Sequence, residues 1–292
     1  MIGNAKSTIK LESTQLSCDF LGFACVAQLF NIIESKDPNT RMDVDFSHLT
    51  WLESGLCSPL GAIWNHFGGA RCNYIFSDEP LRSHLRRNGF HRFINETALH
   101  SKYKNQVMFS SFDSYDEEQI GEYLSSQLLG KEMPEMSNQA KQKLLTSIVE
   151  VFDNAFTHSE ITGNVCVCGQ LYPKMHLLSL TITDLGIGVR TSVGRKLRNG
   201  LTTKQAIEWA IIEGNSTRSS NGPIGIGLSD IIKFLELNNG SICILTNDGI
   251  WNKNGPEQPS FRQIKQNFHG TVVHFKIRTD DTNSYYLRKE VR

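Results

Sequence analysis

The stretch LSLTITDLGIG at residues 178–188 decides the fold of the second half of this 292-residue chain. Apolar and polar residues alternate strictly, which predicts a β-strand over residues 177–184 that ends at Asp184. Asp184 continues the apolar face of that strand, where a carboxylate is costly unless hydrogen-bond donors meet it. Gly186 and Gly188 follow at once and let the backbone approach a ligand closely. The amine of a purine would be a fitting donor; the alternative is an aspartate that caps an ordinary turn.

A helix predicted over residues 138–158 precedes this strand and carries a second polar group. Its apolar side chains share one arc, and Glu150, Asn154 and His158 fall opposite them at four-residue spacing. Such a face is usually just solvated. Glu150 and Asn154 also suit chemistry, because a carboxylate can accept a proton from an attacking water and an amide oxygen can bind Mg²⁺. His158 can simply cap the C-terminal end of the helix.

Two further segments complete the pattern. Residues 222–228 read GPIGIGL and run directly into an amphipathic helix, so their N–H groups can hold phosphate. Gly270 and Thr271 open an alternating strand, where threonine is most often only a good strand former. The absence of GxxxxGK[ST] excludes a Walker-type phosphate loop, and residues 186–188 lack the third glycine of a dinucleotide fingerprint.

Taken in order, these segments resemble the N box, G1 box, G2 box and closing threonine of the GHKL ATPases. That superfamily includes the gyrase B subunit, MutL, the ninety-kilodalton heat-shock chaperones and the histidine kinases, and the resemblance spans residues 138–278. It implies a Bergerat fold, an α/β architecture with a mixed sheet, helices on one face and ATP held between helices and a mobile lid. The lid would be residues 190–224, in which Thr202 and Gln205 form a capping box at the start of a helix.

The resemblance also assigns roles by motif position. Glu150 would be the catalytic base, Asn154 would bind Mg²⁺, and Asp184 would hold the adenine amine with help from the Thr271 hydroxyl. Arg218 is our candidate for a contact to the γ-phosphate, because charged forked donors suit that group, and a solvated loop arginine is the alternative. The expected ATP-binding residues are Asn154, Asp184, Gly186, Gly188, Arg218, Gly225, Gly227, Leu228 and Thr271.

The first half reads as a small α/β domain. Residues 44–56 (VDFSHLTWLESGL) resemble the central strand and loop of STAS domains, the fold of anti-sigma-factor antagonists. In those antagonists a serine near this loop is phosphorylated, and Ser54 is the nearest match. Glu53-Ser54-Gly55 replaces the usual Asp-Ser-(Ser/Thr)-Gly, so one hydroxyl position is missing. A plain α/β interaction domain is the alternative.

Changes in composition along the chain indicate where its domains begin and end, and the net charge bears on its partners. We expect a STAS-like domain at 1–103, a polar connecting segment at 104–137 with a short helix near 117–129, an ATP-binding domain at 138–280 and a tail at 281–292. Thirty basic and thirty acidic residues cancel, so a nucleic-acid partner is not favoured. The arginines of the N-terminal half form a basic patch that is usually only a solvated face. They are Arg71, Arg82, Arg86, Arg87 and Arg92.

The cysteines and the apolar runs bear on location. Seven cysteines at scattered spacings argue against a disulfide framework or a zinc site, and favour reduced thiols in a cytoplasmic protein. No apolar run reaches the roughly 18 residues of a membrane span.

Three functions fit these observations. The leading hypothesis is a Mg²⁺-dependent ATPase whose lid closure drives a conformational or partner-binding switch. The second is an anti-sigma-type serine/threonine kinase that acts on a STAS-like partner, and the third is a nucleotide sensor or scaffold without turnover. A homodimer is expected by analogy, together with a protein partner that the sequence does not identify.

Overall fold

A five-stranded sheet forms the centre of the computed structural model, which describes residues 6–100, 104–128, 131–158, 164–215, 227–287 and 290. Its strands are β6 (Gln106–Phe112), β7 (Val165–Tyr172), β8 (Leu177–Asp184), β9 (Ser241–Asn254) and β10 (Ser260–Arg278). Their order is β6-β7-β8-β10-β9, and every pairing is antiparallel. The strand predicted at 177–184 is therefore confirmed with its bounds.

The antiparallel sheet corrects the mixed sheet that we expected. Short connections can join only antiparallel neighbours, and just the turn at residues 173–176 separates β7 from β8. Likewise, β9 and β10 follow one another along the chain and form one long hairpin. β6 lies inside the segment expected to be a polar connection, and it pairs with β7 at the edge of the sheet.

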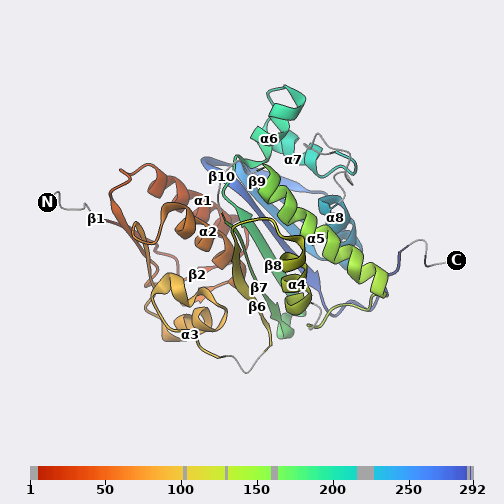
Figure 1. Cartoon of the computed structure of the whole chain (residues 1–292), viewed down its shortest axis with the longest axis horizontal. Coiled ribbons are helices and arrows are strands. Elements are labelled where there is room, and N and C mark those ends of the chain that lie inside the picture. Colours follow the sequence, from red (N-terminus) through yellow and green to blue (C-terminus); the bar gives the residue numbers. More distant parts are fainter. Residues whose placement is uncertain are drawn as a thin grey trace.

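One face of the sheet, which we call the pocket face, is covered by α4 (Glu117–Leu128), α5 (Asn138–His158) and α8 (Gly227–Asn238) (Figure 1). The helices predicted at 138–158 and near 117–129 are thus confirmed. Two more helices, α6 (Gly188–Leu197) and α7 (Thr203–Ala210), stand beyond one end of the sheet. Buried side chains of α4, α5, α8 and the sheet form one hydrophobic core on this side.

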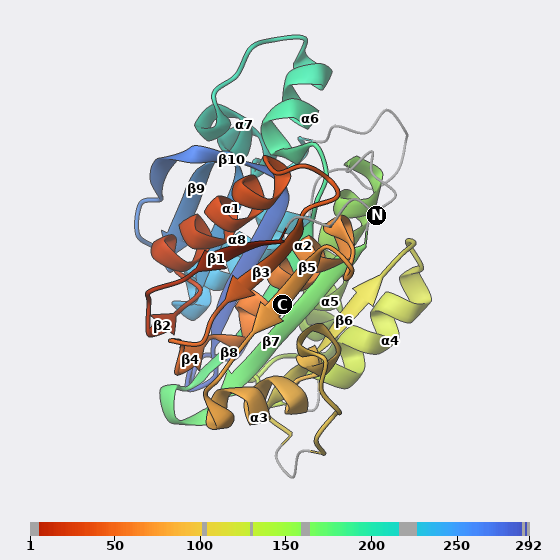
Figure 2. The ribbon, with the colours of Figure 1, turned by 90° about the vertical axis from the view of Figure 1, so that its left-hand side faces the viewer.

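The N-terminal half covers the opposite face, which we call the back face (Figure 2). It contains a parallel sheet in the order β1-β3-β5, made of Lys6–Lys10, Arg41–Asp45 and Cys72–Ile75. Its helices are α1 (Phe20–Glu34), α2 (Cys57–Phe67) and α3 (Glu79–Arg87), and the short strands β2 (Gln15–Leu16) and β4 (Trp51–Leu52) pair in parallel. Two 3₁₀ turns, η1 (Ser54–Leu56) and η2 (Phe90–Ile94), complete it.

Helices therefore cover both faces of the central sheet, whereas we expected them on one. The reason is that side chains of the N-terminal half and of the back face share a single core, in which Cys166, Cys168 and Cys243 of the sheet meet apolar residues of α1 and α2. Burying both faces of a sheet in this way requires strands with buried residues on each side, and β7 and β8 are buried along nearly their whole length. Among the helices that the structure describes, not one combines the length and the apolar character that crossing a bilayer requires.

Candidate functional site

A pocket of about 140 Å³ lies between the pocket face of the sheet and the helices α5, α6, α7 and α8. Apolar side chains from β8, β10, α5 and α6 form much of its lining, together with Trp209 of α7. Six of the residues expected from the sequence line this one pocket, although they come from five different elements. They are Glu150, Asn154, Asp184, Gly188, Leu228 and Thr271.

Asp184 is the most unusual residue of the pocket. Its carboxylate is at the end of β8 and the residue is only 8% exposed. The Gly186 N–H donates to Oδ1 at 2.9 Å, and Thr271, its neighbour across the β8–β10 pair, donates through its N–H and hydroxyl. Burial outweighs these donors and raises the pKa of Asp184 from 3.8 to about 7. Because burial disfavours the charged carboxylate, a further N–H donor in the pocket would stabilise its ionised form and lower its pKa.

Gly270 explains how Thr271 comes so close to Asp184. A Cβ atom at Gly270 would lie 2.1 Å from the Asp184 carbonyl oxygen, and its φ of +125° is a conformation that few other residues adopt. The glycine thus lets β10 approach the end of β8, where the threonine can donate to the carboxylate.

Glu150 and Asn154 lie one turn apart on α5, both half-buried, and both line the pocket. The expected solvated face of this helix is therefore turned partly inward. Gly227 does not line the pocket but begins α8 beside Glu150, where a Cβ atom would lie 2.7 Å from the Glu150 Cβ. Its place is the close contact between α8 and α5, which positions the neighbouring Leu228 at the pocket wall.

Both glycines after Asp184 make contacts within the protein. Gly186 supplies a donor to Asp184, as described above. Gly188 has a φ of +74°, and a Cβ atom there would lie 2.7 Å from the amide group of Asn247 in β9. We attributed both glycines to the approach of a ligand; the contacts show that turn geometry and Asn247 already require glycine at position 188.

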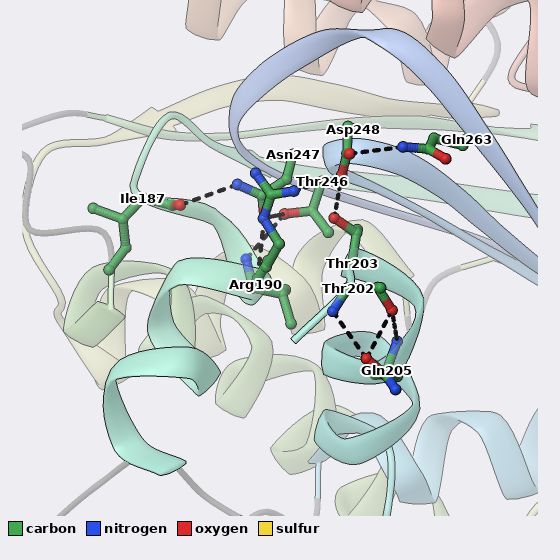
Figure 3. Close-up of polar contacts among 10 residues, drawn as sticks. Ile187, Arg190, Thr202, Thr203, Gln205, Thr246, Asn247, Asp248 and Gln263 are labelled. Atoms are coloured by element: carbon green, nitrogen blue, oxygen red, sulfur yellow. Dashed lines mark hydrogen bonds and ion pairs between the residues drawn. The ribbon is translucent and has the colours of Figure 1, made fainter. Parts of the chain in front are cut away.

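Thr246 and Asn247 cap the start of α6 (Figure 3). The Val189 N–H donates to Thr246 Oγ1 at 3.0 Å, and the Arg190 N–H donates to Asn247 Oδ1 at 3.0 Å. Asn247 Nδ2 also donates to the carbonyl oxygen of Ile187 at 3.3 Å. These N–H groups of α6 are therefore satisfied by side chains of β9 and are not open to a phosphate.

Asp248 is the hub that joins α6 and α7 to the β9–β10 hairpin (Figure 3). Its Oδ1 pairs with Arg190 Nη1 at 3.0 Å and accepts from the Thr203 hydroxyl, and its Oδ2 accepts from Gln263 Nε2 at 3.1 Å. Reasoning from the sequence missed this network. The available signal was the polar run Asn247–Gly249, which interrupts an otherwise apolar strand.

The base of the expected lid is thus well anchored. The capping box of α7 is confirmed: Gln205 N–H donates to Thr202 Oγ1 at 3.2 Å, and Thr202 N–H donates to Gln205 Oε1 at 3.0 Å. Arg218 and Gly225, which we expected to contact ATP, lie outside the described residues, as does the side chain of His158.

Ser54 lies away from the pocket, at the back face of the sheet. It is 0% exposed, its hydroxyl donates to Gln170 Oε1 of β7 at 2.6 Å, and it lies 2.8 Å from His84 Nε2 of α3. Burial lowers the pKa of His84 to about 4, so the imidazole is neutral at pH 7. A kinase cannot reach this hydroxyl in the folded arrangement, unlike the serine of a STAS antagonist.

Three arginines of the basic patch make polar contacts within the protein. Arg82 and Arg86 both pair with Glu96, at 2.6 and 3.4 Å. Arg71 donates to the carbonyl oxygens of Ile33 and Lys36.

No protein-family model matches the chain, and no curated protein is significantly similar to it in sequence. The function of the pocket must therefore be inferred from its own residues.

Proposed function

We propose that the pocket binds ATP together with Mg²⁺, and that the chain is an ATPase in which nucleotide binding changes its contacts with a protein partner. One observation carries the proposal: a buried carboxylate with a pKa near 7 lies in a largely apolar pocket that also presents a carboxylate and a carboxamide one helical turn apart. These residues also follow one another along the chain in the order of the motifs of the GHKL ATPases, which they resemble.

Asp184 favours a ligand with an N–H donor on a flat apolar body. Gly186 and Thr271 already donate to its carboxylate, yet burial still disfavours the charged form. The amine of adenine would offset that cost, while the neighbouring apolar side chains, such as Ile182 and Val193, would cover the ring. An anionic end of the ligand is excluded beside Asp184 by like charge, so the phosphates belong elsewhere in the pocket.

Glu150 and Asn154 fit the phosphate end of such a ligand. Their side chains offer oxygen atoms, the ligand type that Mg²⁺ prefers, from the same wall of the pocket. Asn154 would hold the ion, which when bound would offset the charge of the phosphates. Ions that prefer sulfur or nitrogen ligands fit this donor set poorly, since the pocket lining in the described residues contains no cysteine or histidine.

Glu150 would then act as the base. Its carboxylate would take one proton from a water molecule as the water oxygen attacks the γ-phosphorus, and the bond from that phosphorus to the bridging oxygen would break. ADP and phosphate leave, and the proton on Glu150 returns to solvent. Asp184 and Thr271 would hold the adenine ring and would take no part in the proton transfer or the attack on phosphorus.

The signal to a partner would pass through α6 and α7. Val193 of α6 and Trp209 of α7 line the pocket, so an occupied pocket would contact both helices. Asp248 binds the N-terminal ends of both helices to the β9–β10 hairpin. When α6 and α7 close over the nucleotide, they would therefore pivot about Asp248. A homodimer and a protein partner, as the resemblance implies, are part of this proposal.

The test is an ATP titration and a phosphate-release assay on four proteins. Asp184→Asn should weaken ATP binding at least tenfold, while Glu150→Gln should bind ATP as the wild type does and lose about 10²-fold or more in turnover. Asp153→Asn is the matched control, because Asp153 is a carboxylate on the same helix that hydrogen-bonds Thr157 and does not line the pocket.

Each other outcome has a definite meaning. A wild-type protein that does not bind ATP would contradict the whole proposal. Turnover by Glu150→Gln at the wild-type rate would remove Glu150 as the base. Labelled γ-phosphate that ends on protein would identify a kinase, and Asp184-dependent binding without turnover would identify a sensor.

A further inference from the structure

A second cluster of chemically active side chains lies on the back face of the sheet. The Cys18 thiol, the Glu53 carboxylate and the His274 imidazole each offer one atom, and these three atoms lie within 4.8 Å of one another. It is the one group of three such residues found in the part of the chain that the structure describes. All three are buried, at 6%, 6% and 2% exposure.

The cluster is separate from the pocket. Side chains alternate along β10, and Thr271 and Val273 line the pocket, so His274 faces the other side of the sheet. Cys18 precedes α1 and Glu53 precedes η1, so the three groups come from both the N-terminal half and the central sheet.

His274 has the arrangement that is typical of a metal-binding imidazole. Its Nδ1 lies 2.8 Å from the Thr181 hydroxyl, which fixes the orientation of the ring. Its Nε2 is buried and has no hydrogen-bond partner. Metal-bound histidines commonly use one ring nitrogen for a protein hydrogen bond and the other for the ion. A bound cation would give the orphaned Nε2 the partner that it lacks.

Glu53 is held in place by contacts on both of its oxygens. Oε2 accepts from the Cys18 N–H at 2.8 Å, and Oε1 pairs with Lys276 Nζ at 2.8 Å. Each carboxylate oxygen retains a second lone pair. The two contacts therefore orient the carboxylate as neighbouring groups orient a metal ligand, and the Lys276 ammonium offsets part of the negative charge that a thiolate would add.

Space and distances also suit an ion. If the three atoms were all 4.8 Å apart, an ion at their centre would be about 2.8 Å from each (4.8 Å divided by √3), and Zn–S and Zn–N bonds are about 2.3 and 2.1 Å long. Closing the site thus takes less than an ångström of movement. Gly55 lies directly beside the cluster, because a Cβ atom there would lie 2.3 Å from Thr181 Oγ1 and 2.7 Å from Cys18 Sγ.

We propose that Cys18, Glu53 and His274 bind one divalent cation of the zinc type and thereby fasten the N-terminal half to the back of the sheet. A sulfur, a nitrogen and an oxygen ligand favour zinc over Mg²⁺ or Ca²⁺, which take oxygen ligands. On binding, the Cys18 S–H bond breaks, a sulfur–metal bond forms and one proton passes to solvent. Neither imidazole nor carboxylate needs to lose a proton.

Cobalt titration of the metal-free full-length chain tests the proposal. Co²⁺ in place of zinc should bind one equivalent, give a thiolate-to-cobalt charge-transfer absorption, release one proton per ion and be displaced by Zn²⁺. Cys18→Ser and His274→Gln should each abolish the charge-transfer band or weaken binding at least tenfold. Cys25→Ser is the control, since Cys25 is a half-buried thiol on α1 outside the cluster.

The wild-type protein alone can overturn the proposal. If it binds neither Co²⁺ nor Zn²⁺, or binds Co²⁺ without the charge-transfer band, the cluster is not a thiolate metal site. A band that persists in both Cys18→Ser and His274→Gln would place the ion elsewhere. If Cys18→Ser fails to fold, the Co²⁺ spectra of the wild type and of His274→Gln still test whether the cluster binds the ion. The result does not depend on ATP binding.

Discussion

Replacing Asp184 with asparagine measures what the buried carboxylate costs the fold. Burial raises the pKa of Asp184 from 3.8 to about 7, so the folded chain holds this proton more tightly than the unfolded chain does. The stability that this group contributes is complete below about pH 4 and is lost as pH rises to 7. The loss is about 1.4 kcal/mol per pH unit and about 4 kcal/mol in total, with no further change above pH 7.

Asparagine has nearly the same shape and no charge to desolvate. Its side-chain oxygen can still accept from the Gly186 N–H, which donates to Oδ1 of Asp184. We therefore expect the free energy of unfolding of Asp184→Asn, relative to wild type, to rise by about 4 kcal/mol between about pH 4 and pH 8. At pH 8 the variant should be the more stable protein, and its affinity for adenosine should be lower.

Urea unfolding of both proteins in the same buffers, at half-unit steps of pH, gives this difference directly. All other titrating groups cancel in the comparison when the slopes against urea agree. A difference in unfolding free energy that stays constant from pH 4 to pH 8 would refute the reasoning. It would mean that Asp184 is solvated enough to ionise normally, which would also remove the main reason for an amine-bearing ligand.

Three backbone and capping predictions follow from the same contacts. Gly188→Ala should lower the free energy of unfolding by about 1–3 kcal/mol. The loss should exceed that of Gly68→Ala, because Gly68 also has a positive φ but has open space around it. Equal losses in urea unfolding would show that the contact with Asn247 in β9 has no energetic effect. Gly227→Ala should cost about 1–3 kcal/mol by overpacking α8 against α5, whereas a gain in thermal stability would show that helix propensity dominates. Thr202→Ala should cost about 1 kcal/mol and speed hydrogen exchange in the first turn of α7, and unchanged exchange there would contradict the role of the capping box.

The elements that the sequence predicted best are those with an undisturbed hydrophobic period. α5 and β8 have the expected bounds because their apolar positions repeat without a break. β6 was missed because Ser110 and Ser111 are polar residues on an edge strand, where partial exposure is tolerated. The β9–β10 hairpin is hard to recognise from the sequence for a similar reason: its outer part has polar side chains, and its register shifts twice between Gln263 and Thr271.

The sequence predicted single residues of the candidate site, but it did not predict the contacts that surround them. Glu150, Asp184 and Thr271 belong to local patterns, each at a recognisable point of a helix or a strand, and the structure brings them to one pocket. The Asp248 network and the cluster around His274 depend on strand order, which no local pattern reports. Scattered cysteines argued against a metal site, because that reasoning weighs spacing along the chain and not proximity in the fold.

The back face gives the N-terminal half a direct connection to the pocket. The Ser58 hydroxyl, at the start of α2, donates to the carbonyl oxygen of Cys166 at 2.9 Å, and its oxygen lies 2.8 Å from the Thr183 hydroxyl oxygen. Thr183 is the residue immediately before Asp184 in β8, and alternation turns the two side chains to opposite faces of the same strand. Because the back face is close-packed, a shift of the N-terminal half cannot be absorbed by empty space on that side of the strand. A partner that moves α2 would therefore act on the orientation of Asp184, and a ligand held by Asp184 would in turn resist that movement.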